Sequence, residues 1–199
     1  MRIGVLSLQG DFREHIQALQ DCGAEAFALN KVDELAGIDG LVLPGGESTT
    51  IAKLARSFAL FDSIVSHIDD GLPVYGSCAG MILLADRVLD KAVGQETFGG
   101  IDMTVRRNAF GRQVDSFEAD ISVHGIAGEP VRAVFIRAPW VESLSGEVKV
   151  LAQVSYRGDS HAVAVRQNNL LATSFHPELT GDLRIHQYFV DEIVAKRTR

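Results

Sequence analysis

One cysteine of this chain lies between small residues in the pattern that hydrolases use to present a nucleophile. The pentapeptide Gly76-Ser77-Cys78-Ala79-Gly80 separates two apolar segments. A glycine, a nucleophile and a second glycine at this spacing predict a tight turn from a strand into a helix. Such a turn holds the nucleophile in a strained backbone conformation, and the helix N-terminus stabilises a thiolate. The alternative is a structural cysteine in a glycine turn, and the whole pentapeptide favours the nucleophile.

A thiolate nucleophile needs a base, and His176 is the best placed of six histidines. His176-Pro177-Glu178 follows the apolar run 170–175, so the imidazole is expected at the carboxyl end of a strand, where parallel sheets bind ligands. Pro177 favours extended backbone at His176, and residues i and i+2 of extended chain point the same way. Glu178 is therefore predicted to orient the imidazole, whose other nitrogen faces the thiol. We expect structural or solvated roles for His15, His67, His124, His161 and His186.

Acyl transfer also needs donors for an oxyanion. The backbone N–H of Ala79, directly after the nucleophile, is one expected donor. The second is expected from Gly46, in the loop Pro44-Gly45-Gly46-Glu47-Ser48, because glycine lets a peptide plane turn toward a substrate. The alternative is a loop that only ends a strand and caps the next helix with Ser48 or Thr49.

The segments around these residues predict an α/β fold. Apolar and amphipathic segments alternate in the first half, which indicates a parallel sheet with right-handed crossovers. The second half consists of short β-branched segments joined by Gly, Asn or Asp, some of them expected to be antiparallel or at an edge. We predict a three-layer, mostly parallel central sheet with helices on both faces plus antiparallel edge strands, in a single domain over residues 1–199. The expected strands are 3–8, 25–29, 39–43, 72–76, 101–106, 117–123, 131–136, 148–154, 161–165 and 170–175, with helices at 12–22, after Ser48, from Ala79 and at 183–194, and a loop with partial helix at 86–100.

Composition narrows the possible partners. The 199 residues carry a net charge of −7, which argues against nucleic acid as a partner. No apolar run approaches the ~20 residues that span a bilayer, so no membrane association is expected, and residues 1–8 are interpreted as a core strand and not a signal peptide. Two cysteines without a pairing pattern favour a reducing, cytoplasmic setting. No Cys/His cluster suggests a metal site, and we expect neither metal nor cofactor.

Taken together, these motifs resemble the class I, triad-type glutamine amidotransferases. The elbow and His-Pro-Glu are common to that class. Further stretches across nearly the whole chain are similar to the glutaminase subunits of pyridoxal 5'-phosphate synthase, and the most specific are the Arg-Asn-x-Phe-Gly-Arg-Gln block and the Ile-Arg-Ala-Pro segment. The similar stretches are 8–10, 43–50, 76–80, 107–118, 135–139 and 174–180.

The resemblance implies an activity and a partner. The chain would hydrolyse L-glutamine to glutamate and ammonia, with Cys78, His176 and Glu178 as catalytic residues. The ammonia would pass to a barrel-shaped synthase subunit that builds pyridoxal phosphate from a pentose phosphate and a triose phosphate. In this family the glutaminase works poorly without that partner, and the loop at Gln9-Gly10 lies near the partner surface. The residues that would contact glutamine are Gly46, Glu47, Ser48, Arg107, Ile136 and Arg137.

The arginines of the specific block also permit an interpretation from charge alone. Arg106, Arg107 and Arg112 cluster in an acidic protein, and one of them is expected to face a carboxylate of substrate or partner. Asp115 and Glu118 are expected to neutralise the others, and the alternative is a solvated loop.

Three other functions stay open at this stage. The first is a class I amidotransferase subunit that serves a different ammonia acceptor. The second is a cysteine hydrolase or thiol-dependent stress protein on a similar sheet, a class that often keeps the elbow without His-Pro-Glu. The third is a catalytically dead docking module, against which the intact Cys78, His176 and Glu178 argue.

Overall fold

A mixed ten-stranded sheet forms the centre of the molecule. The computed structural model describes residues 1–110 and 116–197. Five strands in the spatial order β2-β1-β3-β4-β12 are parallel, which confirms the predicted parallel half of the sheet. Because β4 lies between β3 and β12, the loops after these three strands end at one edge of the sheet. The bounds are Arg2–Leu6 for β1, Glu25–Leu29 for β2, Gly40–Leu43 for β3, Val74–Ser77 for β4 and Leu170–Thr173 for β12.

The second half of the chain extends this sheet with antiparallel strands, as predicted. Beyond β12 the order continues β11-β9-β6-β5, and β10 also pairs with β11. All of these pairings are antiparallel except that of β5 with β6. A separate antiparallel ribbon joins β7 and β8. The bounds are Ala85–Leu89 for β5, Ile101–Arg106 for β6, Ser116–Ile121 for β7, Val131–Ile136 for β8, Trp140–Leu144 for β9, Lys149–Tyr156 for β10 and Asp159–Gln167 for β11.

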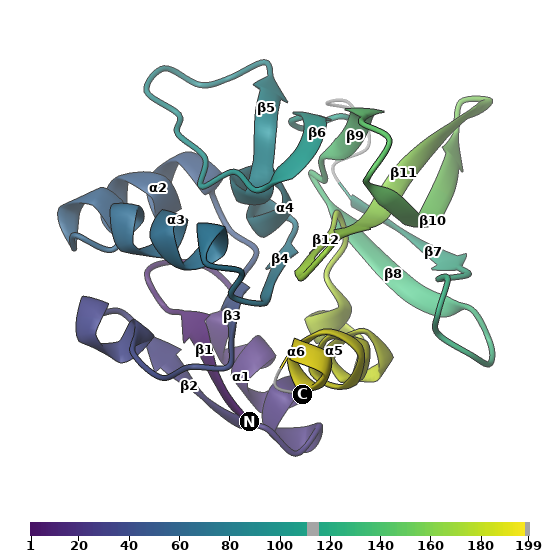
Figure 1. Cartoon of the computed structure of the whole chain (residues 1–199). Coiled ribbons are helices and arrows are strands. Elements are labelled where there is room, and N and C mark those ends of the chain that lie inside the picture. Colours follow the sequence, from purple (N-terminus) through teal and green to yellow (C-terminus); the bar gives the residue numbers. More distant parts are fainter. Residues whose placement is uncertain (111–115, 198–199) are drawn as a thin grey trace.

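Helices cover both faces of the parallel strands (Figure 1). Successive side chains of a strand point to opposite faces, so Leu41 and Leu43 join the core beneath α2 and α3, whereas Val42 joins the core beneath α1 and α5. This confirms the three-layer α/β fold. The helices are α1 (Phe12–Asp21), α2 (Ser48–Ser57), α3 (Phe61–Asp69), α4 (Ala79–Leu84), α5 (Arg184–Tyr188) and α6 (Ala195–Arg197), with 3-10 turns η1 (Val32–Leu35) and η2 (Pro177–Leu179) and a π-helix η3 (Phe189–Val194).

Two local predictions were wrong. The segment 86–100 begins in strand β5 instead of forming a loop with partial helix, because Arg87 ties it to Asp102 on β6. The helix after residue 47 is capped by Glu47, whose carboxylate accepts a 2.7 Å hydrogen bond from the Thr50 N–H, and not by Ser48 or Thr49. The predicted closing helix is present, and it continues as a π-helix from residue 189.

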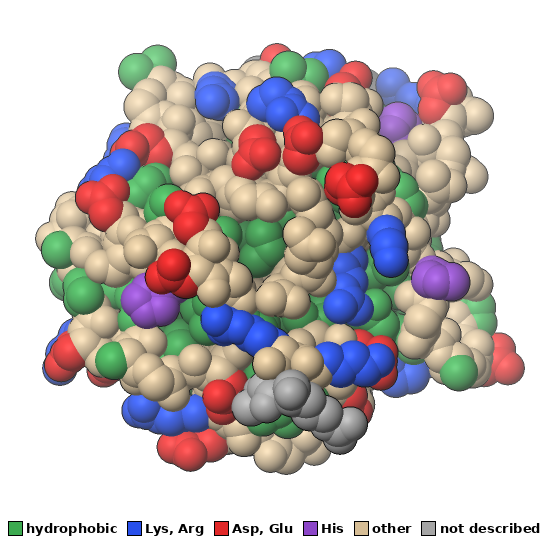
Figure 2. All heavy atoms as spheres, viewed as in Figure 1, with side chains coloured by type: hydrophobic (Ala, Val, Ile, Leu, Met, Phe, Trp, Pro, Cys, Tyr) green, Lys and Arg blue, Asp and Glu red, His purple; other side chains and the backbone are tan. Residues whose placement is uncertain are grey.

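Acidic and basic side chains are interspersed on the face of the molecule that Figure 2 shows. Among the described residues, no helix combines the length and apolar character needed to cross a bilayer.

Candidate functional site

Cys78 lies at the turn between β4 and α4, as the pentapeptide predicts. Its φ of 50° and ψ of −99° are strained for a residue with a side chain, and the residue is only 6% exposed. A Cβ at position 76 would overlap the carbonyl of Gly80, and a Cβ at position 80 would overlap the carbonyl of Leu43. The two glycines therefore let β4, α4 and β3 approach closely enough to form the turn.

Gly80→Ala is expected to destabilise the protein. Alanine normally stabilises a helix interior relative to glycine by about 1 kcal/mol, but here its methyl group collides with backbone and should cost about 1 to 3 kcal/mol. Gly146→Ala is the matched control, because a Cβ added at position 146 would meet nothing within 4 Å among the described residues. We expect the control to stay within about 0.5 kcal/mol of the parent in urea denaturation. Equal stability of the two variants would contradict the steric role of Gly80.

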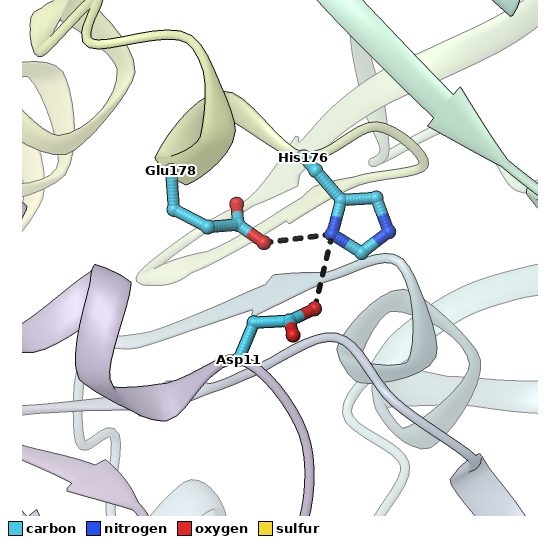
Figure 3. A group of neighbouring side chains, drawn as sticks. All are labelled: Asp11, His176 and Glu178. Atoms are coloured by element: carbon cyan, nitrogen blue, oxygen red, sulfur yellow. Dashed lines mark hydrogen bonds and ion pairs between the residues drawn. The ribbon is translucent and has the colours of Figure 1, made fainter.

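The imidazole of His176 is held by a buried carboxylate. Its Nδ1 lies 2.7 Å from Oε1 of Glu178, within hydrogen-bonding distance, and 3.6 Å from Oδ2 of Asp11. Figure 3 shows both carboxylates on this side of the ring, with the other ring nitrogen turned away from them. The side chain of Glu178 is fully buried and that of His176 is 5% exposed. Glu178 reaches the ring from the 3-10 turn η2, and not from the extended chain that the sequence suggested.

The charges around His176 favour its protonated form. Burial alone would lower its pKa, but the side chains of Cys78 and Glu178 raise that pKa to about 10. Burial would likewise raise the pKa of the Glu178 carboxyl, whereas His15 and His176 together hold it below its usual range. These opposing effects fit an imidazolium and a carboxylate that stabilise one another beside the side chain of Cys78.

A pocket of about 420 Å³ opens above Cys78 and His176, a size that suits a small-molecule ligand. All six residues that the resemblance assigns to glutamine line this pocket, as do both predicted oxyanion donors. Gly46 has a φ of 144°, so its conformation is one that other residues rarely adopt. Sequence reasoning did not assign five further lining residues to the pocket, which are Gln9, Asp11, Ile82, Asn108 and Pro139.

Arg107 is paired inside the pocket. Its guanidinium donates to Oε1 of Glu47 at 2.9 Å and to Oε1 of Gln95 at 2.7 Å. Gln95 in turn donates to Oγ of Ser48 at 3.0 Å. The loop is also held from the other side, because Oε1 of Gln9 accepts a 2.7 Å hydrogen bond from the Glu47 N–H. These contacts fix the orientation of Glu47 and Ser48.

Glu118 was expected to neutralise an arginine of the block at positions 106–112, and this prediction was wrong. This carboxylate pairs with Arg132 across the β7–β8 ribbon. Arg106 instead pairs with Asp90 and Glu142, on the segment after β5 and on β9. Arg112 and Asp115 lie outside the described residues.

Asp11, His176 and Glu178 have the residue types of a metal site, and their donor atoms lie within 4.8 Å of one another. The nitrogen that a cation would need is Nδ1 of His176, which is already hydrogen-bonded to Glu178. A cation would have to displace that proton, so the arrangement fits an oriented base better than a metal centre.

Comparison with known proteins places the chain in a family. The model of the SNO glutamine amidotransferase family matches residues 5–195. The chain belongs to the SNO glutamine amidotransferase family. The match contains the elbow, the glycine loop and the His176 segment, so every part of the pocket falls within the SNO family region.

Curated relatives and solved structures resemble the chain along nearly its full length. A pyridoxal 5'-phosphate synthase subunit PdxT from Streptomyces coelicolor is 61% identical over 98% of this chain and 95% of the relative. The PdxT of Kineococcus radiotolerans is 62% identical over 96% and 94% of the two chains. A crystal structure of a glutamine amidotransferase superposes with a TM-score of 0.88 at 46% identity, over 97% and 98%. A putative GMP synthase subunit from Thermoplasma acidophilum has a TM-score of 0.69 at 19% identity, over 100% and 96%, and supports the fold alone.

Two residues near the site were assigned structural or solvated roles from sequence. His15 and His186 are both fully buried, and His15 faces Glu178. The sequence did carry a signal that His15 is buried, since His15, Ala18 and Leu19 recur at the spacing of one buried helix face.

Proposed function

We propose that this protein is a glutaminase that hydrolyses L-glutamine to L-glutamate and ammonia and supplies the ammonia to a pyridoxal 5'-phosphate synthase subunit. The observation that carries this proposal is that Cys78 and His176 line one pocket while Glu178 holds the imidazole from behind. The 61% identical PdxT relative supports the choice of partner.

In the first half of the proposed reaction, the Cys78 thiolate attacks the side-chain carbonyl carbon of glutamine. The N–H groups of Gly46 and Ala79 hold the oxyanion that forms. As the tetrahedral intermediate collapses, the C–N bond breaks and His176 donates a proton to the departing ammonia. The enzyme is left with a thioester between Cys78 and the glutamyl group.

In the second half, water cleaves the thioester. His176, now neutral, removes a proton from the water as it attacks the same carbonyl carbon. The C–S bond then breaks, which releases glutamate and restores the thiolate and the imidazolium. Glu178 stays ionised throughout, and its charge stabilises the protonated imidazole in both halves.

Substrate recognition would use the charged wall of the pocket. Arg137, which lines the pocket at a φ of 43°, is a candidate partner for the α-carboxylate of glutamine. Glu47, whose carboxylate is held by Arg107, is a candidate partner for the α-ammonium group. Ser48 and Ile136 would complete the polar and apolar sides of the pocket.

Mixing the chain with its synthase subunit tests this function. We expect slow glutamate release from the chain alone and a marked increase when the barrel-shaped synthase subunit of the same organism is added. With a pentose phosphate and a triose phosphate present, glutamine should then support pyridoxal phosphate formation. Glutamate release that responds only to another amidotransferase acceptor would favour the rival function, and no release under any condition would overturn the proposal.

We also propose a cytoplasmic setting, which rests on the two free cysteines.

A further inference from the structure

Two buried histidines lie behind the proposed triad. His15 comes from α1 and His186 from α5, and both side chains are fully buried. Nδ1 of His15 lies 2.9 Å from Nε2 of His186, so the two rings share a hydrogen bond. Burying two imidazoles costs free energy unless their polar atoms are used, so their position needs an explanation.

The other nitrogen of His15 faces the carboxylate of Glu178. Nε2 of His15 lies 3.4 Å from Oε2 of Glu178, longer than an ordinary hydrogen bond, and this buried nitrogen has no hydrogen-bond partner among the described residues. Oε1 of the same carboxylate binds His176, while Oε2 accepts from the Ser77 hydroxyl at 3.4 Å. His15 therefore lies nearest the carboxylate oxygen of Glu178 that does not bind His176.

The protonation of this pair is constrained by its surroundings. Burial, followed by the proximity of His15, lowers the pKa of His186 to about 3, so His186 is neutral at pH 7. If His186 donates to Nδ1 of His15, the remaining proton of a neutral His15 is on Nε2. If His15 is protonated, Nε2 again carries a proton. In these two cases the Nε2 atom that lies 3.4 Å from Oε2 of Glu178 carries a proton.

We propose that His15 is a positioning residue that holds Glu178 ionised and oriented toward His176, and that His186 orients His15 in turn. This inference rests on the proposed glutaminase function, because it adds a support to the same triad. The titratable groups that face His15 are His186 on α5, Glu178 on η2 and Tyr75 on β4, whose ring centroid lies 5.9 Å from that of His15. Tyr75 stays protonated, since burial and then Glu178 raise its pKa well above 10.

Two amide variants separate positioning from mere packing. In His15→Gln the side chain can place its amide nitrogen near the former Nε2, where it donates to Glu178. In His15→Asn the shorter side chain reaches the position of Nδ1 and His186 but not Glu178. Both variants bury one neutral amide, so they differ chiefly in reach. His124→Gln is the control, because His124 is exposed and its side chain makes no hydrogen bond within the described residues.

The measurement is the rate of Cys78 alkylation by iodoacetamide between pH 5 and 10, followed by peptide mass spectrometry. It needs no glutamine, so a failed glutaminase assay would count against the proposed function and leave this test intact. We expect His15→Asn to slow alkylation of Cys78 at pH 7 by about tenfold and to shift the rise of the rate to higher pH, since Glu178 then loses the imidazole nitrogen that lies 3.4 Å from its Oε2. His15→Gln and His124→Gln should keep the profile of the parent.

Three outcomes would overturn the proposal. One is a parental profile in His15→Asn, and another is an equal loss in both amide variants, which would indicate a packing role. The third outcome is loss of the parental alkylation profile in a folded His15→Gln protein. If His15→Asn fails to fold, Cys22 will react as fast as an exposed thiol, and the comparison then rests on His15→Gln.

Discussion

Replacing Cys78 by alanine is expected to reduce glutamate release by at least about 10⁴-fold, even with the synthase subunit present. The loss should be this large because the thioester cannot form without the thiol, and His176 alone cannot position a water at the carbonyl carbon. The variant should still fold, since the thiol donates only a long hydrogen bond, of 3.9 Å, to the Ile136 carbonyl within the described part of the chain.

Cys22→Ala provides the matched control. Burial and the nearby Asp191 and Asp21 raise the pKa of Cys22 to about 11, so this thiol is protonated at neutral pH. We expect the control to keep full glutaminase activity. Activity retained by Cys78→Ala, or lost by Cys22→Ala in a folded protein, would contradict the assignment of the nucleophile.

Changing Glu178 to glutamine is expected to lower the turnover of glutamine by about 10³ to 10⁴-fold, as removal of the charge behind a triad histidine does elsewhere. The amide is nearly the same size but carries no charge, and it can present an N–H to the imidazole. Glu178 raises the pKa of His176, so the variant should lower that pKa below its parental value of about 10. An NMR titration of the His176 ring follows this change directly.

The pKa of His176 also determines how the stability of the fold changes with pH. The folded-state pKa of His176, about 10, lies above its ordinary value of 6.5, so protonation of this ring stabilises the fold below pH 6.5. That stabilisation is lost as the pH rises toward 10, and Glu178→Gln should flatten this part of the profile. Glu192→Gln is the control, because Glu192 is partly exposed and pairs with Lys196. Equal kinetics and titration in the two variants would contradict the role of Glu178.

The parts of the site that could be predicted from sequence are those in which one short motif contains both the functional side chain and the residues that shape the backbone around it. The elbow is an example, since Gly76 and Gly80 are needed wherever a strand turns this tightly around a nucleophile. His176 was also predictable, because its strand ends at the same edge of the sheet as β4. The alternation of strands and helices likewise gave the parallel half of the fold.

The parts that sequence reasoning missed depend on contacts between distant segments. Asp11 and His15 belong to the first helix region, yet they meet residues near position 176 that are adjacent only after the sheet has formed. A polar residue on an apolar helix face has no local signal that distinguishes a ligand of a carboxylate from a packed histidine. The cap of α2 was misjudged for a related reason, since Ser48 is instead bonded to Gln95, 47 positions away.

The most direct test of the central claim is to look for the thioester itself. The chain and its synthase subunit are mixed with isotope-labelled glutamine, quenched in acid within the first turnovers and digested, and the peptides are weighed. We predict a labelled glutamyl group on the peptide that contains Cys78, absent from the Cys22 peptide and removed by hydroxylamine. Labelled glutamate released steadily with no adduct on Cys78, or an adduct on another residue, would contradict nucleophilic attack by Cys78.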